Sequence, residues 1–207
     1  MIVIGLTGGI ASGKSTAAEL LKALGAVLID ADRLGHRAYE PGSIGFEAVV
    51  NEFGHEIVSG DGTVNRLVLG GKVFGDPEQM QRLNAIVWPA IRRLAQEEID
   101  ECRRRGAEVV VLEAALLIEA GWDDLADEIW VVSVKAERAR ARLKQRNGLP
   151  EDQAQARIDA QLSNRDRQQH ADVKIDNSDT LEKFEKRIKA QWQKLQKRIQ
   201  KSAASRK

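Results

Sequence analysis

Residues 8–15 read Gly8-Gly9-Ile10-Ala11-Ser12-Gly13-Lys14-Ser15 and match the pattern G-x-x-x-x-G-K-[ST] at every fixed position. A short apolar run, Ile2 to Leu6, precedes the glycines, and a helical pattern follows Lys14. Glycines permit positive φ and close backbone approach, so consecutive amides can point into one concavity and bind phosphate oxygens. A helix that begins near Lys14 adds the positive end of its dipole at the same place. The stretch therefore predicts a P-loop between a strand and a helix.

The residue types of this loop indicate how a bound ATP would be held. Lys14 is expected to reach the β- and γ-phosphates as a mobile cation, and the Ser15 hydroxyl is expected to ligate Mg²⁺. Thr16 follows near the α-phosphate. The predicted nucleotide-binding residues of the loop are Gly9, Ile10, Ala11, Ser12, Gly13, Lys14, Ser15 and Thr16. The alternative is an ordinary glycine-rich turn with an exposed lysine, which the length and context of the match disfavour.

The rest of the pattern indicates an α/β fold. Apolar runs without alternation are typical of strands buried on both faces, and the two strongest are Ile2 to Leu6 and Val109 to Leu112. Weaker runs of the same type are Val27 to Ile29, Ile129 to Val134 and Val173 to Ile175. Helical patterns cover Lys14 to Leu24, much of Asn84 to Arg105, Ala136 to Arg146 and Leu181 to about Ile199. Strands that alternate with helices predict a P-loop nucleotide-kinase fold with a five-stranded parallel sheet flanked by helices.

Two polar intervals interrupt this alternation. Residues 34–105 hold little strand signal and many turn residues, which predicts a helical insertion. Residues 147–171 are rich in Arg, Gln and Asp and have too little apolar surface to form core, so they are a candidate lid. The nucleotide-binding core is then expected over residues 1–33, 106–146 and 172–203, and residues 204–207 as a frayed basic tail.

Composition and charge narrow the class of protein. The chain has 207 residues, of which 43% are hydrophobic and 30% charged, and its formal net charge of +1 gives no general argument for a nucleic acid or a membrane as partner. The single cysteine, Cys102, excludes an internal disulfide framework and a multi-cysteine metal site. With no long apolar run and no secretory signal at Met1, the expected location is the cytoplasm.

Positive charge concentrates toward the C-terminus. Residues 181–207 include ten basic and two acidic side chains, a net +8. A solvated face of a terminal helix is the favoured interpretation, and a tail that binds anions or nucleic acid is the alternative. An apolar stripe at helical spacing predicts packing on the core, and it consists of Leu181, Phe184, Ile188, Trp192 and Leu195.

Carboxylates at the ends of candidate strands suggest phosphoryl transfer. Asp30 and Asp32 follow the second strand, and ligands of open α/β sheets bind beyond the carboxyl ends of strands. One of them could accept the proton of an acceptor hydroxyl, although capping of a turn or helix is the alternative. Glu113 ends the strand at Val109 and could support Mg²⁺ directly or through water. A helix-start or salt-bridge role for Glu113 stays open.

Arginines cluster on the helix before the candidate lid. Arg142 and Arg146 are four residues apart and share a face, so both could converge on phosphate when a lid closes. Their planar forks suit the charge of the transition state. Arg138 falls on the same face, whereas Arg140 is expected to point away into solvent. A surface ion pair is the alternative for each of them.

Several segments, in order, resemble dephospho-CoA kinase over residues 2 to about 178. They are Gly5-Leu6-Thr7-Gly8-Gly9-Ile10, Leu24-Gly25-Ala26, Ile29-Asp30-Ala31-Asp32, Pro41-Gly42, Phe53-Gly54, Asp61-Gly62, Asn65-Arg66, Val73-Phe74, Leu116-Leu117-Ile118-Glu119, Arg142, Arg146-Asn147-Gly148-Leu149 and Ile175-Asp176-Asn177. The resemblance implies ATP-dependent phosphorylation of the ribose 3′-hydroxyl of dephospho-CoA, which gives coenzyme A and ADP in the last step of CoA biosynthesis. It also implies that residues 34–105 form the CoA-side domain.

The same resemblance assigns roles to individual residues. Asp32 aligns with the proposed catalytic aspartate and contacts substrate, while Asn177 aligns with a position near the adenine. Arg66 and Lys72 lie on the substrate side. Together with the residue-based reasoning, the expected catalytic set is Asp32, Lys14, Arg142 and Arg146. The expected partner is the small-molecule acceptor, without nucleic acid or membrane, in a monomer or weak homo-oligomer.

The sequence also departs from the family pattern. Ala11 stands where glycine is usual, so the loop must tolerate a Cβ or adopt negative φ there. Trp88-Pro89 replaces a common His-Pro, and Glu113 replaces an aspartate before Ala114-Ala115. The tryptophan and the His36 region are similar to the kinase half of animal bifunctional CoA synthase.

Rival functions remain open at this point. Another small-molecule kinase of the same architecture is the nearest rival. A nucleotide switch without transfer chemistry is disfavoured, because no segment resembles the guanine-specifying Asn-Lys-x-Asp. A nucleic-acid binder that uses the basic C-terminal helix would show a steep salt dependence of binding.

Overall fold

A computed structural model describes residues 1–204, without the side chain of residue 203. Two compact units make up this part of the chain. The first contains Met1–Ile29 and the residues from Cys102 onward, and the second is Asp30–Glu101.

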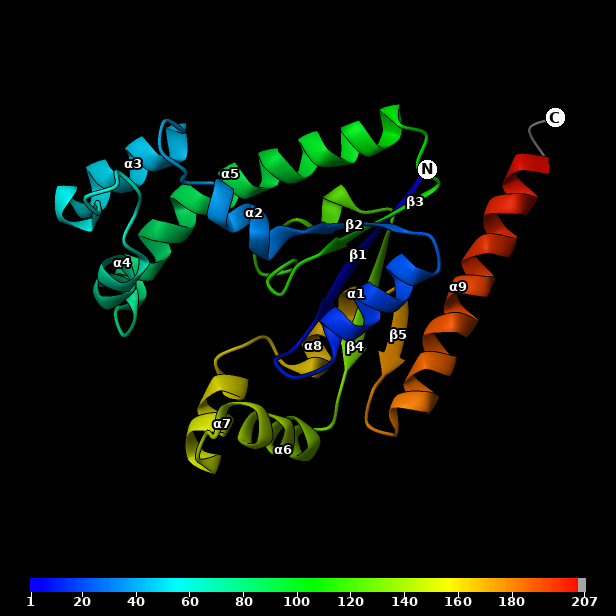
Figure 1. Cartoon of the computed structure of the whole chain (residues 1–207). Helices are drawn as coiled ribbons and strands as arrows, with labels where there is room; N and C mark the ends of the chain where they lie inside the picture. The colour runs from blue at the N-terminus through cyan, green and yellow to red at the C-terminus, as the bar shows by residue number, and fades with distance from the viewer. Residues whose placement is uncertain (205–207) are drawn as a thin grey trace. The chain divides into compact units, whose positions relative to one another are not determined.

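The first unit is built on a parallel sheet (Figure 1). Its five strands are β1 (Ile2–Gly8), β2 (Val27–Asp30), β3 (Val109–Glu113), β4 (Glu128–Ser133) and β5 (Val173–Asp176). The order across the sheet is β2-β3-β1-β4-β5, and β1 pairs in parallel with both β3 and β4. Each predicted strand is present, and the α/β fold class is confirmed.

The central strands are buried on both faces, as their unbroken apolar runs predict. Alternate residues such as Ile4, Val111 and Trp130 pack into one core cluster with α1 (Lys14–Ala23) and α9 (Leu181–Ala204). Residues of the opposite parity, such as Val110, are buried as well. Each fully buried side chain of this size contributes about 1.5–3 kcal/mol, so these strands account for much of the stability of the unit.

Helix α9 follows the predicted apolar stripe with one exception. Phe184, Ile188, Trp192 and Leu195 are buried, but the side chain of Leu181 is 59% exposed. Leu181 is the first residue of the helix, where the chain is only beginning to lie along the sheet. Its predicted packing on the core is therefore wrong.

The basic face of α9 carries many ion pairs. Lys186 pairs with Glu182 one turn earlier, and Arg187 contacts both Asp176 and Asp179. Arg198 makes two hydrogen bonds to Glu128 on β4. This pairing favours a solvated, ion-paired face over an anion-binding one for residues 181–204. Residue 204 ends α9, and the other predicted tail residues, 205–207, lie outside the described part of the chain.

Two polar helices follow β4. They are α6 (Ala136–Asn147) and α7 (Glu151–Asp159), which lie side by side in Figure 1. Gly148 ends α6 with φ 64°, a left-handed conformation that suits glycine. Arg140 donates a hydrogen bond of 2.7 Å to Gln155 on α7, so the expectation that it points into solvent is wrong.

Three short elements complete the first unit. They are η2 (Asp123–Leu125), α8 (Asn164–Arg167) and η3 (Gln168–His170). Ser163 caps α8 by accepting a hydrogen bond from the backbone of Asp166.

Helices also make up the second unit. It contains α2 (Ala31–Arg37), α3 (Ile44–Phe53), η1 (His55–Ile57), α4 (Arg66–Val73) and most of α5 (Pro77–Arg104). Its own core includes Val49, Phe53, Ile57 and Leu69. Side-chain caps explain where three helices begin, since Asp30, Ser43 and Asn65 each accept hydrogen bonds from first-turn amides.

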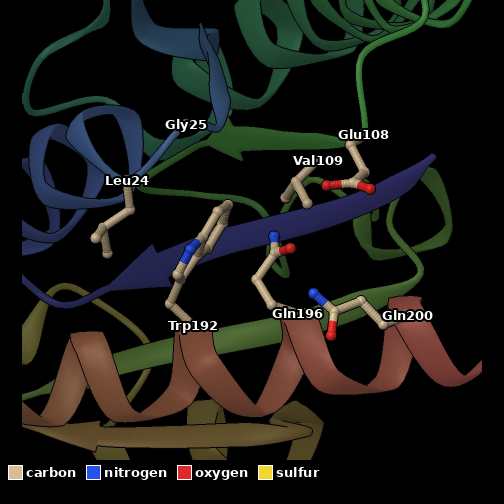
Figure 2. Close-up of a pocket in the computed structure, with 7 residues that line it drawn as sticks. All are labelled: Leu24, Gly25, Glu108, Val109, Trp192, Gln196 and Gln200. Atoms are coloured by element: carbon tan, nitrogen blue, oxygen red, sulfur yellow. The ribbon is translucent and has the colours of Figure 1, made fainter.

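A pocket of about 320 Å³ opens at the amino end of β3, where Trp192, Gln196 and Gln200 of α9 face Glu108 and Val109 (Figure 2). The P-loop follows the carboxyl end of β1, and β1 is parallel to β3. The pocket and the P-loop therefore lie at opposite ends of these strands. No predicted site residue lines this pocket. Within residues 1–204, no helix is both long enough and apolar enough to cross a membrane.

Candidate functional site

The P-loop has the backbone that its glycines predict. Strand β1 ends at Gly8, and α1 begins at Lys14 after Gly13, which has φ 93°. A Cβ on Gly13 would lie 2.2 Å from Nδ2 of Asn177, so both conformation and space require glycine there. The Ser12 amide donates to the carbonyl of Gly9 at 3.1 Å, which closes the turn.

Ala11, which stands where the family usually has glycine, adopts a positive φ. Its φ is 58°, so the loop accommodates a Cβ in the left-handed region and does not switch to negative φ. For a residue other than glycine this conformation costs roughly 1–2 kcal/mol. The loop geometry is therefore kept at the expense of some local strain.

Lys14, Ser15 and Glu113 meet at the carboxyl edge of the sheet. Lys14 Nζ and Ser15 Oγ each lie 2.8 Å from Oε1 of Glu113, which ends β3. Glu113 is buried, and its partner Lys14 is largely shielded from water. Glu113 accepts from both donors, which includes the salt-bridge role that the sequence left open for it, and its support of Mg²⁺ together with Ser15 stays a prediction.

This cluster also fits a magnesium ion. Adjacent oxygen ligands of octahedral Mg²⁺, at about 2.1 Å from the ion, are about 3 Å apart, and Ser15 Oγ and Glu113 Oε1 are separated by 2.8 Å. Mg²⁺ usually takes one or two protein carboxylates and completes its shell with phosphate and water. In residues 1–204, no group of three or more His, Cys, Asp or Glu side chains could hold a metal on its own.

Arg142 and Asn177 support the loop from its outer side. Arg142 donates to the carbonyl of Ala11 at 2.9 Å, to that of Ser12 at 3.4 Å and to that of Asn177 at 2.9 Å. The buried Asn177 side chain donates to the same Ser12 carbonyl at 2.7 Å. Desolvation, and then the nearby charge of Arg138, lower the pKa of the Arg142 guanidinium. An arginine stays protonated at neutral pH even so, and its charge strengthens these bonds.

The segment after α7 contacts the P-loop at Ile10. Gln161 Oε1 accepts a hydrogen bond of 2.7 Å from the amide of Ile10. Arg167 on α8 is completely buried and contacts Glu119, which lies in the loop after β3. Arg167 is thus a buried charged residue within residues 147–171, the segment whose small apolar surface predicts a lid and not core. No spacing pattern in the sequence marks Gln161 or Arg167, whereas Glu119 stands in one of the segments that carry the family resemblance.

Three further predicted residues are Arg146, Asp30 and Asp32. Arg146 lies exposed in the last turn of α6. Asp30 accepts hydrogen bonds from the amides of Asp32 and Arg33, which is the capping role that the sequence left open for it. Asp32 occupies the first turn of α2 in the second unit, and its orientation toward the P-loop stays a prediction.

Arg66 and Lys72 lie on α4 of the second unit. The Arg66 guanidinium sits over the ring of Tyr39 at 5.8 Å from its centroid, and Lys72 pairs with Glu56 at 2.7 Å. That pair lowers the pKa of the exposed Glu56 carboxyl, mainly through the Lys72 hydrogen bond. Both cations are accessible at the surface of this unit, and their contact with a substrate stays a prediction.

Comparison with known proteins identifies what the chain is similar to. The family model described as dephospho-CoA kinase matches residues 2–183. A dephospho-CoA kinase of Geobacter sulfurreducens is 46% identical over 194 residues, with 94% of this chain and 98% of the relative covered. One from Symbiobacterium thermophilum is 45% identical over 192 residues, covering 93% and 80% of the two chains. The solved dephospho-CoA kinase from Campylobacter jejuni superimposes with a TM-score of 0.72 at 25% identity, covering 94% and 97%.

Proposed function

Since this chain belongs to the dephospho-CoA kinase family, we propose that it transfers the γ-phosphoryl group of ATP to the ribose 3′-hydroxyl of dephospho-CoA. The products are coenzyme A and ADP, and the reaction is the last step of CoA biosynthesis. The observation that carries this proposal is the P-loop whose Lys14 and Ser15 both converge on Oε1 of Glu113.

The nucleotide binds along the loop from Gly9 to Thr16. Backbone N–H groups of the loop, other than that of Ile10, which donates to Gln161, donate hydrogen bonds to the phosphate oxygens. Lys14 leaves Glu113 to neutralise charge on the β- and γ-phosphates. Ser15 and Glu113 would hold the Mg²⁺ that accompanies ATP, and the ion would supply further charge neutralisation. Asn177, whose amide nitrogen is fixed on the Ser12 carbonyl, borders the nucleotide on its adenine side.

Asp32 is the proposed proton acceptor for the attacking hydroxyl. A carboxylate positioned within hydrogen-bond reach of that hydroxyl contributes about 10²- to 10⁴-fold as a general base. Residues 34–105 form the CoA-side domain, where Arg66 and Lys72 contact the anionic acceptor. Transfer then requires the acceptor oxygen and the γ-phosphorus to lie in line.

Closure of the predicted lid, residues 147–171, completes the reaction site and involves its part before Gln161, since Gln161 and Arg167 already contact the P-loop and Glu119. A closed lid excludes water, which would otherwise attack the γ-phosphate and hydrolyse ATP. Arg142 and Arg146, on the helix before this segment, stabilise the phosphoryl group during transfer. For Arg142 this role requires that some of its bonds to the loop carbonyls be exchanged for bonds to phosphate.

The proposed setting is the cytoplasm, with the protein acting as a monomer or weak homo-oligomer. The ion pairs of α9 support a solvated helix, and nucleic acid is not part of the proposed function.

Release of ADP with dephospho-CoA, adenosine and AMP as acceptors tests the proposal. Turnover is expected with dephospho-CoA and not with the two smaller acceptors. Preference for AMP would instead assign the chain to the nearest rival, a nucleoside-monophosphate-type kinase.

Asp32→Asn should keep nucleotide affinity and slow single-turnover transfer, because it preserves the geometry and removes the proton acceptor. If it weakens ATP binding and leaves the transfer rate intact, Asp32 has a positioning or metal role.

A further inference from the structure

Three side chains from one segment, Gln161, Asn164 and Arg167, meet the P-loop at Gly9. A Cβ built on Gly9 would lie 3.4 Å from Arg167 Nη1, 3.6 Å from Asn164 Oδ1 and 3.7 Å from Gln161 Oε1. A side chain at Gly9 would thus be in van der Waals contact with all three, so these three side chains border the loop at Gly9. All of these residues belong to the first unit.

Gln161 makes the one directional contact of the segment with a loop amide. Its side-chain oxygen accepts the Ile10 N–H at 2.7 Å, across 151 residues of chain. This bond fixes the peptide plane between Gly9 and Ile10, because both of the flanking backbone dihedrals must be kept to preserve it. Gln161 therefore holds the loop at Ile10, whereas Arg142 holds it at the carbonyls of Ala11 and Ser12.

Arg167 holds the segment in place. It donates from Nη1 to the carbonyl of Leu162 and from Nη2 to Oε1 of Glu119, both at 2.9 Å. The first bond folds the chain back directly after Gln161, and the second ties it to the loop after β3. One planar fork thus fixes two backbone segments at once, which a lysine cannot do.

The burial of this ion pair is informative. Arg167 has 0% side-chain exposure, and Nε of Arg167 and Oε2 of Glu119 have no hydrogen-bond partner among the described residues. A buried ion pair whose polar atoms are not all hydrogen-bonded adds little to the stability of a fold, because the cost of removing its charges from water offsets their attraction. A pair retained under these conditions is better explained by the geometry that it imposes.

Two further bonds anchor the same segment to β4. Asn164 Nδ2 donates to the carbonyl of Val134 at 2.8 Å, and Gln168 Nε2 donates to Oγ of Ser133 at 3.0 Å. The segment is therefore tied to the end of β4 and, through Glu119, to the loop after β3, and Gln161 projects from it onto the P-loop.

We infer that Arg167 and Glu119 are a positioning pair for nucleotide binding, which acts through Gln161 on the Gly9–Ile10 peptide of the P-loop. The inference rests on the proposed function only in that the loop binds a nucleotide. Neither member of the pair touches the phosphates. Their effect is to keep the loop amides in a single arrangement before the nucleotide arrives, which removes an ordering step from binding.

Binding of ADP, measured by calorimetry, tests the inference without phosphoryl transfer. Gln161→Ala is expected to raise the Kd by about fivefold, the equivalent of one lost hydrogen bond. Gln168→Ala is the matched control, because it removes a bond at Ser133, after Arg167 in the chain, and leaves the bonds of Asn164 and Arg167 that hold the part of the segment next to Gln161. It should leave the Kd at the parental value. An unchanged or smaller Kd for Gln161→Ala, or an equal rise for Gln168→Ala, overturns the inference.

Arg167→Lys tests whether the pair acts through Gln161. It should raise the Kd by a similar factor, and the double variant with Gln161→Ala should be no weaker than the weaker single variant. Multiplying effects would show that Arg167 acts by another route and would overturn the inference. If Arg167→Lys does not fold, the comparison of Gln161→Ala with Gln168→Ala still decides.

Turnover separates positioning from a general loss of structure. For Gln161→Ala, the KM for ATP should rise while the KM for the acceptor stays at the parental value, and a parallel rise in both would contradict the inference. A parent protein that binds ADP but does not phosphorylate dephospho-CoA would refute the proposed function alone. Absence of ADP binding in the parent would refute both.

Discussion

Two different roles are possible for Arg142, support of the P-loop and stabilisation of the transferred phosphate, and one substitution distinguishes them. The sequence places it among the groups that stabilise transferred phosphate, whereas its guanidinium bonds to the carbonyls of Ala11, Ser12 and Asn177. If these bonds are its main role, Arg142→Met should destabilise the P-loop and with it the first unit. Methionine keeps most of the apolar stem and removes every donor.

The size of the effect follows from the contacts. Two bonds from the charged fork have donor–acceptor distances of 2.9 Å, and the third, at 3.4 Å, is near the limit for a hydrogen bond. Hydrogen bonds to a charged group contribute about 1.5–3 kcal/mol each, and Arg142 is only half-buried, so water replaces part of the loss. We expect Arg142→Met to lower the free energy of unfolding by about 2–3 kcal/mol. Arg142→Lys, which keeps the charge and one donor direction, should lose about half of that.

Urea unfolding, the Kd for ADP and the single-turnover transfer rate measure the three relevant quantities. Lys144→Met is the matched control, since it removes an exposed cation from the same helix and should stay within about 0.5 kcal/mol of the parent. A supporting role predicts a loss of stability and a higher Kd together. If Arg142→Lys keeps parental stability and Kd but transfers phosphate about 100-fold more slowly, the supporting role is refuted and the phosphate role is correct.

Three further changes have defined outcomes. Ala11→Gly should raise the free energy of unfolding by about 0.5–1 kcal/mol in urea melts, because it relieves the strain at φ 58° by more than the added chain entropy removes. Glu113→Gln should raise the Mg²⁺ concentration for half-maximal activity about tenfold, and an unaltered requirement would exclude Glu113 from metal support. Burial alone would raise the pKa of Glu128, but hydrogen bonds from Arg198 and Trp130 lower it below its ordinary value of 4.5. The ionised Glu128 therefore stabilises the fold at neutral pH, and this stabilisation is lost as the pH falls through the lowered pKa. Glu128→Gln should lower the free energy of unfolding by less than about 1 kcal/mol at neutral pH and leave it unchanged in strong acid. Unfolding measured at a series of pH values checks both outcomes.

The strands of the first unit could be predicted because burial on both faces selects continuous apolar runs in the sequence. Strands β1 and β3 are buried on both faces, and their unbroken apolar runs locate them to within one or two residues. In the second unit, the start of α5 is predicted wrongly, since the sequence indicates a helix from Asn84 and the helix begins at Pro77. A local signal exists for the true start: Asp76 accepts hydrogen bonds from the amides of Glu78 and Gln79, and proline is favoured at the first helical position.

The P-loop could be predicted residue by residue, because each of its positions has a local requirement. Gly13 needs positive φ, and a Cβ on Gly8 would lie 2.4 Å from the carbonyl oxygen of Val132. Lys14 and Ser15 follow at fixed spacing on the first turn of α1. Glu113 belongs to a strand far along the chain, but its position at the end of a buried run was enough to bring it to the same edge.

The groups that hold the loop have no such local requirement. A loop that turns its N–H groups inward to phosphate turns carbonyls outward, and buried carbonyls need donors. Here Arg142 and Asn177 supply them to Ala11 and Ser12, while Gln161 accepts from Ile10. These donors come from segments that follow β4 and β5, and their spacing in the sequence depends on connections of arbitrary length. A P-loop match therefore predicts that such donors exist and that they follow the neighbouring strands. Which arginine becomes a support, and which is left for phosphate, is decided by the path of the chain between those strands.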